Sequence, residues 1–305
     1  YRVAGLPKLD GILWRPVVEN STRAAMVRTG EAQFAHPMPA EQIKVLQKEP
    51  NIDILVQPSV IVRYLFIHKP FTDVRVRRAI NYAINKEALA KVAFSGYARP
   101  VTGVVPEVFE FATKPGPWPY DPKKARELLK EAGYPQGFET VLWSGYNNTT
   151  GQKVIQFIQQ QLRQVGIRTT LRSLEAGQRV ALVESVQDPM KAGMRLYYIG
   201  WSNSTGEIDL AMRPLFHSES WAPALANEGF YKNEKVDRLL DEAIAETDRT
   251  KRAKLYDEVQ STIWNDAPWA FLVTEDVTGA SAKTLKNFRL RPDSSYDFYE
   301  AELVK

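Results

Sequence analysis

The polar residues best placed to bind a ligand follow a stretch that is typical of a buried strand. Leu196–Trp201, "LYYIGW", is rich in aromatic and β-branched side chains. Six of the next seven residues, from Ser202 to Ile208, are polar or Gly, and a buried strand does not need such an end. We therefore expect the loop to touch a small polar ligand, through Trp201, Ser202, Asn203, Ser204 and Thr205, with Asp209 and Arg213 just beyond it.

A second loop has the same character. Ser144–Thr150, "SGYNNTT", follows a predicted strand and precedes a predicted helix. In open α/β sheets, ligands sit beyond the carboxyl ends of strands, where loops and helix N-termini present N–H groups. Hydroxyls and amides beside an aromatic ring suit a small polar ligand, which adds the candidates Tyr146, Asn147, Asn148 and Lys153. The alternative is that both segments are ordinary capping loops.

The sequence favours binding over catalysis. Gly200–Ser204 follows a strand and imitates a nucleophile elbow, but that motif needs Gly at the position of Ser204. The only histidines, His36, His68 and His217, show neither a triad nor a metal-ligand spacing. A secreted hydrolase using Ser202 is the competing hypothesis, and no metal or cofactor is expected.

The composition limits the classes of protein. The 305 residues, 44% of them hydrophobic and 25% charged, suffice for about two globular domains. The 40 basic and 36 acidic residues are mixed along the chain, which argues against nucleic acid as a partner. The absence of cysteine excludes disulfides and thiolate metal sites. No run approaches the roughly 18 apolar residues of a membrane helix.

The hydrophobic pattern predicts alternating helices and strands. A strand at Phe138–Trp143, a helix at Thr150–Val165 and a strand at Ile167–Leu174 form a βαβ unit, which predicts a largely parallel sheet. One long helix is expected from Asp73 to about Phe94. The Pro-rich segment Val101–Tyr120 is either a long ordered connection or a lid. Further strands are expected at Gly11–Val18, Ile52–Gln57, Arg195–Trp201 and Trp269–Thr274, and further helices at Ser21–Thr29, Asn233–Glu246, Thr250–Asn265 and from Asp121–Pro122 to Gly133.

Four blocks of the sequence carry a resemblance to a known family. They are "PKLDGILWRPVVENSTRAAMVRTGEAQF", "FTDVRVRRAINYAINKEALAKVAFSGYARPVTGVVP", "YDPKKARELLKEAGYPQGF" and "YYIGWSNSTGEIDLAMRPLF". In this order they are similar to blocks of the extracytoplasmic solute-binding proteins for peptides and nickel that serve ABC importers. Within the family, the amino-acid sequence is most similar to members that bind glutathione. The resemblance runs from Tyr1 to Lys305.

The resemblance implies a two-lobed α/β fold, the type II periplasmic-binding-protein fold, which closes like a clamshell. Family members begin with a signal peptide and a long N-terminal section of lobe I, and this chain is expected to start after both. Residues 1–62 and 276–305 would then be the remainder of an incomplete lobe I, and residues 63–275 would be lobe II. The crossings near Tyr64–His68 and Thr274–Thr278 would form the hinge, and the missing N-terminal segment would be a partner.

The resemblance also implies a function and ligand contacts. The protein would be periplasmic and would deliver glutathione or a similar small peptide to an inner-membrane ABC permease; other short peptides or a nickel chelate are alternatives. In peptide-binding relatives, an aspartate at the position of Ser204 holds the α-ammonium of the ligand. Its absence fits a γ-linked peptide such as glutathione, with Asp209 or Glu207 as substitutes. Lys153 stands near the place of a carboxylate-binding arginine, and Arg179 and Arg213 are further cations.

Overall fold

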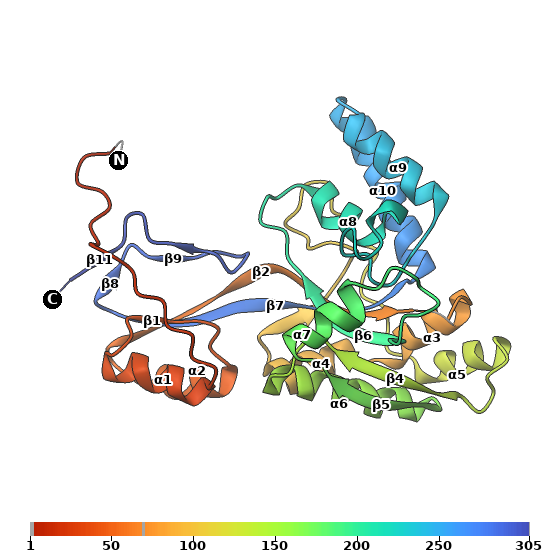
Figure 1. The fold of residues 1–305 in the computed structure, drawn as a ribbon, viewed down its shortest axis with the longest axis horizontal. Coiled ribbons are helices and arrows are strands. Elements are labelled where there is room, and N and C mark those ends of the chain that lie inside the picture. Colours follow the sequence, from red (N-terminus) through yellow and green to blue (C-terminus); the bar gives the residue numbers. More distant parts are fainter. Residues whose placement is uncertain (1–2, 69–70, 305) are drawn as a thin grey trace. The chain divides into compact units, whose positions relative to one another are not determined.

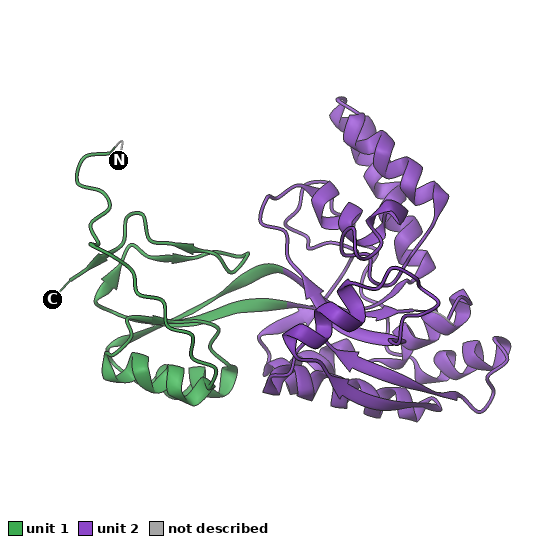
Figure 2. Cartoon of the chain, in the orientation of Figure 1, with its two compact units in different colours: residues 1–60, 275–305 green, residues 61–274 purple. Residues whose placement is uncertain are grey.

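The chain forms two compact units, which are connected through two long strands. The computed structural model describes residues 3–68 and 71–304. Unit 1 comprises residues 1–60 and 275–305, and unit 2 comprises residues 61–274 (Figure 2). The chain passes between them within β2 (Ile52–Ile67) and within β7 (Trp269–Ala282). These limits differ by one or two residues from the predicted lobe limits, and the assignment of the units to the lobes of a clamshell stays a prediction.

Unit 2 is built on a mixed sheet. Its strands lie in the order β7-β2-β6-β4-β5 (Figure 1). β3 (Ala98–Pro100) pairs with β7. β4 (Phe138–Ser144) runs parallel to β5 (Ile167–Ser173) and to β6 (Leu196–Trp201), and α6 (Thr149–Gln164) connects β4 to β5 as the βαβ pattern predicts. β2 is antiparallel to β6. The prediction of a largely parallel sheet was therefore wrong, because one βαβ unit fixes only the direction of the two strands that it connects.

Helices cover one face of this sheet with a continuous core. Buried side chains of α3 to α6 pack against those of β2, β4, β6 and β7, as with Val76, Leu89, Ile158 and Leu196. The predicted single helix from Asp73 to Phe94 is two helices, α3 (Val74–Ala83) and α4 (Lys86–Phe94). Ile84 between them is extended, and the Asn85 side chain accepts a hydrogen bond from the N–H of Ala88, which starts a new helix. The other helices of unit 2 are α5 (Pro122–Glu131), α7 (Ala176–Arg179), the π-helix η1 (Val180–Glu184), α8 (Ile208–Phe216), the 3₁₀ helix η2 (Ser218–Ser220), α9 (Glu234–Ala245) and α10 (Arg249–Asp266).

The Pro-rich segment 101–120 is fixed to the body of unit 2. The N–H of Val101 donates to the carbonyl of Leu272 at 3.2 Å. The Gln260 side chain accepts from the N–H of Thr113 at 3.1 Å and donates to the carbonyl of Phe111 at 2.9 Å. These contacts favour a long ordered connection over a lid.

Unit 1 combines two helices with short strand pairs. α1 (Asn20–Thr29) ends at Gly30, which has a φ of 81° and suits a helix C-terminus. α2 (Ala40–Leu46) follows, and β1 (Phe34–Ala35) pairs with β7 in an antiparallel manner. The remaining pairs are β8 (Leu285–Lys286) with β11 (Glu302–Leu303) and β9 (Arg289–Leu290) with β10 (Tyr296–Asp297).

The predicted strand Gly11–Val18 was wrong. These residues have no regular secondary structure, and Leu13 and Val18 are 85% and 88% exposed. Their apolar run imitates a strand, but Pro16 lacks the N–H that a sheet ladder needs.

Candidate functional site

The two polar loops leave the sheet of unit 2 at the carboxyl ends of neighbouring parallel strands. In the register of β4 with β6, Ser144 lies opposite Tyr198. The N–H of Gly145 donates to the carbonyl of Tyr198 at 2.9 Å. The loop that follows β4 and the loop that follows β6 therefore begin at the same edge, which is the position where open α/β sheets bind ligands.

Tyr146 is anchored by Arg63, a residue that the sequence analysis did not select. The guanidinium of Arg63 on β2 donates to the Tyr146 hydroxyl and lies 4.6 Å from the centre of its ring. Arg63 pairs with Gly200 of β6, and a Cβ on Gly200 would come within 2.4 Å of Arg63 Nη1. The glycine thus lets the guanidinium cross the strand and hold Tyr146. An arginine within the apolar run "VIVRYLFI" was the signal that could have identified it.

Two of the candidate asparagines shape the loops themselves. Asn148 caps α6, and its Oδ1 accepts from the N–H of Gly151 at 2.8 Å. Asn203 is 8% exposed, and its Oδ1 accepts from the N–H and the hydroxyl of Thr205 at 2.9 and 2.8 Å. The capping interpretation accounts for these residues. Asn147, Ser202 and Ser204 are exposed in the loops.

Asp209 and Arg213 neutralise each other. Arg213 Nε and Nη2 lie 2.9 and 3.2 Å from the two carboxylate oxygens of Asp209. Arg213 also donates to Asp241 at 2.7 Å and to the carbonyl of Leu240 at 2.8 Å, which connects α8 to α9. A ligand role for Asp209 and Arg213 stays a prediction, and it would require a ligand to compete with this pairing. Glu207, the other proposed substitute, lies 3.7 Å from Arg252.

The two remaining candidate cations are half-buried. α6 begins at Thr149, so Lys153 is its fifth residue and lies just beyond its first turn. The N–H groups of Thr149 and Thr150 at this helix start have no hydrogen-bond partner in the part of the chain that the structure describes. Arg179 forms a 2.7 Å ion pair with Glu184.

Buried polar groups gather beneath the same edge of the sheet. The Tyr197 hydroxyl and the Trp201 indole N–H are buried without a hydrogen-bond partner among the described residues. A Cβ on Gly145 would stand 2.5 Å from the Tyr197 oxygen, so this hydroxyl lies directly below the first loop. Glu228 is 8% exposed, and burial raises the pKa of its carboxyl to about 8, with a further increase from Glu184. The sequence analysis missed Glu228, because it lies in an irregular segment without a motif.

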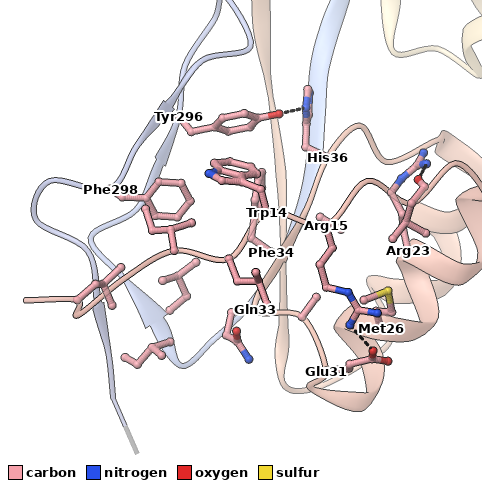
Figure 3. Close-up of a pocket in the computed structure, with 18 of the residues that line it drawn as sticks. Trp14, Arg15, Arg23, Met26, Glu31, Gln33, Phe34, His36, Tyr296 and Phe298 are labelled. Carbon is pink, nitrogen blue, oxygen red and sulfur yellow. Dashed lines mark hydrogen bonds and ion pairs between the residues drawn. The ribbon is translucent and has the colours of Figure 1, made fainter.

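Unit 1 has a separate pocket of about 290 Å³ (Figure 3). The Trp14 ring lies 5.0 Å from that of Tyr296, and the Tyr296 hydroxyl is 2.9 Å from His36 Nδ1. Burial lowers the pKa of His36 to about 4, so the ring is neutral at pH 7. Arg15 is paired with Glu31 at 2.6 Å. This aromatic pocket with internally paired charges suits an apolar group better than a small charged peptide.

Neither a metal-binding cluster nor a membrane-spanning helix occurs among the residues that the structure describes. Within residues 3–68 and 71–304, no three His, Asp or Glu side chains come together in a way that could hold a metal ion. No helix in these ranges combines the length and the apolar character needed to cross a membrane.

The chain belongs to the bacterial extracellular solute-binding proteins, family 5, whose middle region matches residues 1–223. It is 53% identical to the glutathione-binding protein GsiB of Pectobacterium atrosepticum over 308 residues, which cover 100% of this chain and 60% of that protein. It is 51% identical to GsiB of Escherichia coli K12 over 306 residues, which cover 99% and 60%. The chain thus spans about 60% of the length of these curated relatives.

Solved structures share the fold. The periplasmic binding protein DppA from Helicobacter pylori in complex with peptide STSA has a TM-score of 0.83 and 29% identity, covering 95% of this chain and 56% of its own. AgaA from A. tumefaciens R10 in complex with agropinic acid has a TM-score of 0.85 at 20% identity, with coverage of 100% and 63%. The predicted α/β fold of the periplasmic binding proteins is confirmed for the part that this chain spans.

Proposed function

We propose that the protein is a periplasmic binding protein, not an enzyme, that captures glutathione or a similar small peptide for the permease of an ABC importer. The observation that carries this proposal is the 53% identity, along the whole chain, to a protein named for glutathione binding. The two polar loops at one edge of the sheet support it, because this edge is where such folds bind small ligands.

The loops offer groups that match the charges of glutathione. This tripeptide has two carboxylates and one ammonium near neutral pH. One carboxylate would lie at the start of α6, where the N–H groups of Thr149 and Thr150 and the cation of Lys153 favour an anion. The indole N–H of Trp201 would donate to the peptide, and the anchored ring of Tyr146 would pack against it. The remaining proposed contacts to the ligand are Asn147, Ser202, Ser204, Thr205 and Arg179.

A different short peptide is the second candidate ligand. DppA from Helicobacter pylori, 29% identical to this chain, was solved in complex with the peptide STSA. A hydrolase is disfavoured, because the Ser202 hydroxyl has no hydrogen bond to any residue that the structure describes, and a nucleophilic serine requires an adjacent base.

A ligand screen by thermal shift and calorimetry tests the proposal. Purified full-length protein would be titrated with reduced and oxidised glutathione, alanyl dipeptides, the peptide STSA and nickel-histidine. A ligand at one hundred times its Kd stabilises the folded state by about 2.7 kcal/mol, so the true ligand should raise the Tm by several degrees without being consumed. Stabilisation by STSA but not by either form of glutathione would favour the second candidate ligand, and turnover of the ligand would contradict the proposal.

A further inference from the structure

Glu228 is a buried carboxyl without a partner. It is 8% exposed, and no side chain or N–H among the described residues donates a hydrogen bond to it. Burying a carboxyl in this way is unfavourable unless a partner arrives. Groups of this kind cluster at functional sites more often than elsewhere in a fold.

The titratable groups that interact electrostatically with Glu228 do not compensate its charge. They come from four elements: Arg179 of α7, Glu184 of η1, Tyr64 of β2 and Tyr197 of β6. Arg179 is the only cation among them, and it is paired with Glu184 at 2.7 Å. The Tyr197 hydroxyl, which also has no hydrogen-bond partner among the described residues, can donate and accept, and burial together with the charge of Glu228 raises its pKa. Two buried polar groups without a hydrogen-bond partner thus lie within electrostatic range of each other.

The segment that carries Glu228 is held rigidly. The Asn227 side chain donates to the carbonyls of His217 and Tyr231, at 3.1 and 2.9 Å, and accepts from the N–H of Tyr231 at 3.0 Å. A Cβ on Gly229 would stand 2.7 Å from the Phe66 ring, so the backbone at this point lies directly against β2. The backbone on both sides of Glu228 is thus fixed, which limits the positions that its carboxyl can reach and favours preorganisation for a ligand.

We propose that Glu228 binds the ammonium group of the ligand, with the Tyr197 hydroxyl as a second contact. This inference rests on the proposed function and names the protein group that binds the positive charge of the ligand. The two acidic side chains near the second loop are already paired, Asp209 with Arg213 and Glu207 with Arg252. An ammonium placed below the first loop would give Glu228 the partner that the chain itself does not supply.

Calorimetry with two ligands that differ only at the amine tests this assignment. Glutathione carries the ammonium, whereas N-acetylglutathione replaces it with an uncharged amide and keeps both carboxylates and the thiol. Glu228→Gln should lower the affinity for glutathione at least tenfold and change the affinity for N-acetylglutathione less than twofold. The control Glu234→Gln, an exposed glutamate on α9, should change neither affinity. Wild-type affinity of the Glu228→Gln variant for glutathione would overturn the inference and leave the proposed function intact. A wild-type protein that binds neither ligand would refute the proposed function together with the inference.

Proton release provides a readout that a purely structural role would not change. With its pKa near 8, Glu228 is mostly protonated at pH 7, and pairing with an ammonium would ionise it. Burial raises the pKa values of the neighbouring Tyr64 and Tyr197, which therefore stay neutral. Calorimetric titrations in buffers of different ionisation enthalpy measure the protons released when glutathione binds. The wild type should release nearly one proton more than the Glu228→Gln variant. Equal release by both proteins would overturn the inference.

Discussion

Glu228→Gln should stabilise the unliganded protein, and more so at high pH. The pKa of Glu228 is raised from 4.5 to about 8 in the folded state, so the neutral carboxyl supports folding. This contribution is complete below pH 4.5 and is lost as the pH rises towards 8. One pKa unit corresponds to about 1.36 kcal/mol. The linkage relation therefore predicts that the raised pKa of Glu228 lowers the free energy of unfolding of the wild type by about 1 kcal/mol at pH 5 and about 4 kcal/mol at pH 8. Gln has nearly the same shape and no charge, so the variant should be the more stable protein by about these amounts.

Urea unfolding at pH 5, 6, 7 and 8 measures this difference. Six of the seven tryptophans lie in unit 2, so fluorescence reports mainly on the unit that contains Glu228. Taking the difference between variant and wild type removes the contribution of titrating groups that do not interact with Glu228. Glu234→Gln is the control and should show no trend with pH. A variant that is less stable than the wild type, or equally stable at pH 5 and pH 8, would refute the reasoning, because Glu228 would then have a partner when ionised.

Three further changes address the predicted loops. Lys153→Ala should lower glutathione affinity about tenfold, since a charge-assisted hydrogen bond contributes roughly 1.5 to 3 kcal/mol. Titration calorimetry measures this, with Lys124→Ala on α5 as the control. Equal affinities of the Lys153→Ala variant and the wild type would mean that other residues bind the carboxylates. Trp201→Phe should abolish a ligand-induced change in fluorescence, whereas Trp14, in unit 1, should report only folding; a change that survives in the variant would make Trp201 a purely structural residue. Ser202→Ala should leave any background ester hydrolysis unchanged, and a measured loss of turnover would restore the hydrolase hypothesis.

The elements that the sequence predicts well are those with local signals. Asp121 followed by Pro122 begins α5, and Gly30 ends α1, because each residue satisfies backbone groups of its own helix. The break at Ile84 was missed, although Asn85 is a good cap, because the apolar period continues across it. The direction of β2 relative to β6 was not predictable either, since residues far apart in the chain determine it.

The features of the candidate site likewise divide into those with a local sequence signal and those without one. The positions of both loops followed from strand endings, which are local. The pairing of Asp209 with Arg213 was not foreseen, although they are four residues apart in α8, because a ligand role had already been given to both charges. Arg63 and Glu228 were missed for a different reason. Their importance depends on burial, which tertiary packing creates and which a single sequence does not display.

Burial alone does not identify a functional charge, as a comparison within unit 2 shows. Lys86 is even more buried than Glu228, and burial lowers its pKa to about 7. Its ammonium, however, donates to the carbonyls of Asn81 and Trp118 and so connects the end of α3 to segment 101–120. Lys86 therefore has a structural partner in its own chain, whereas Glu228 has none in the described residues. What separates a structural buried charge from a ligand-binding one is whether the fold supplies its partner.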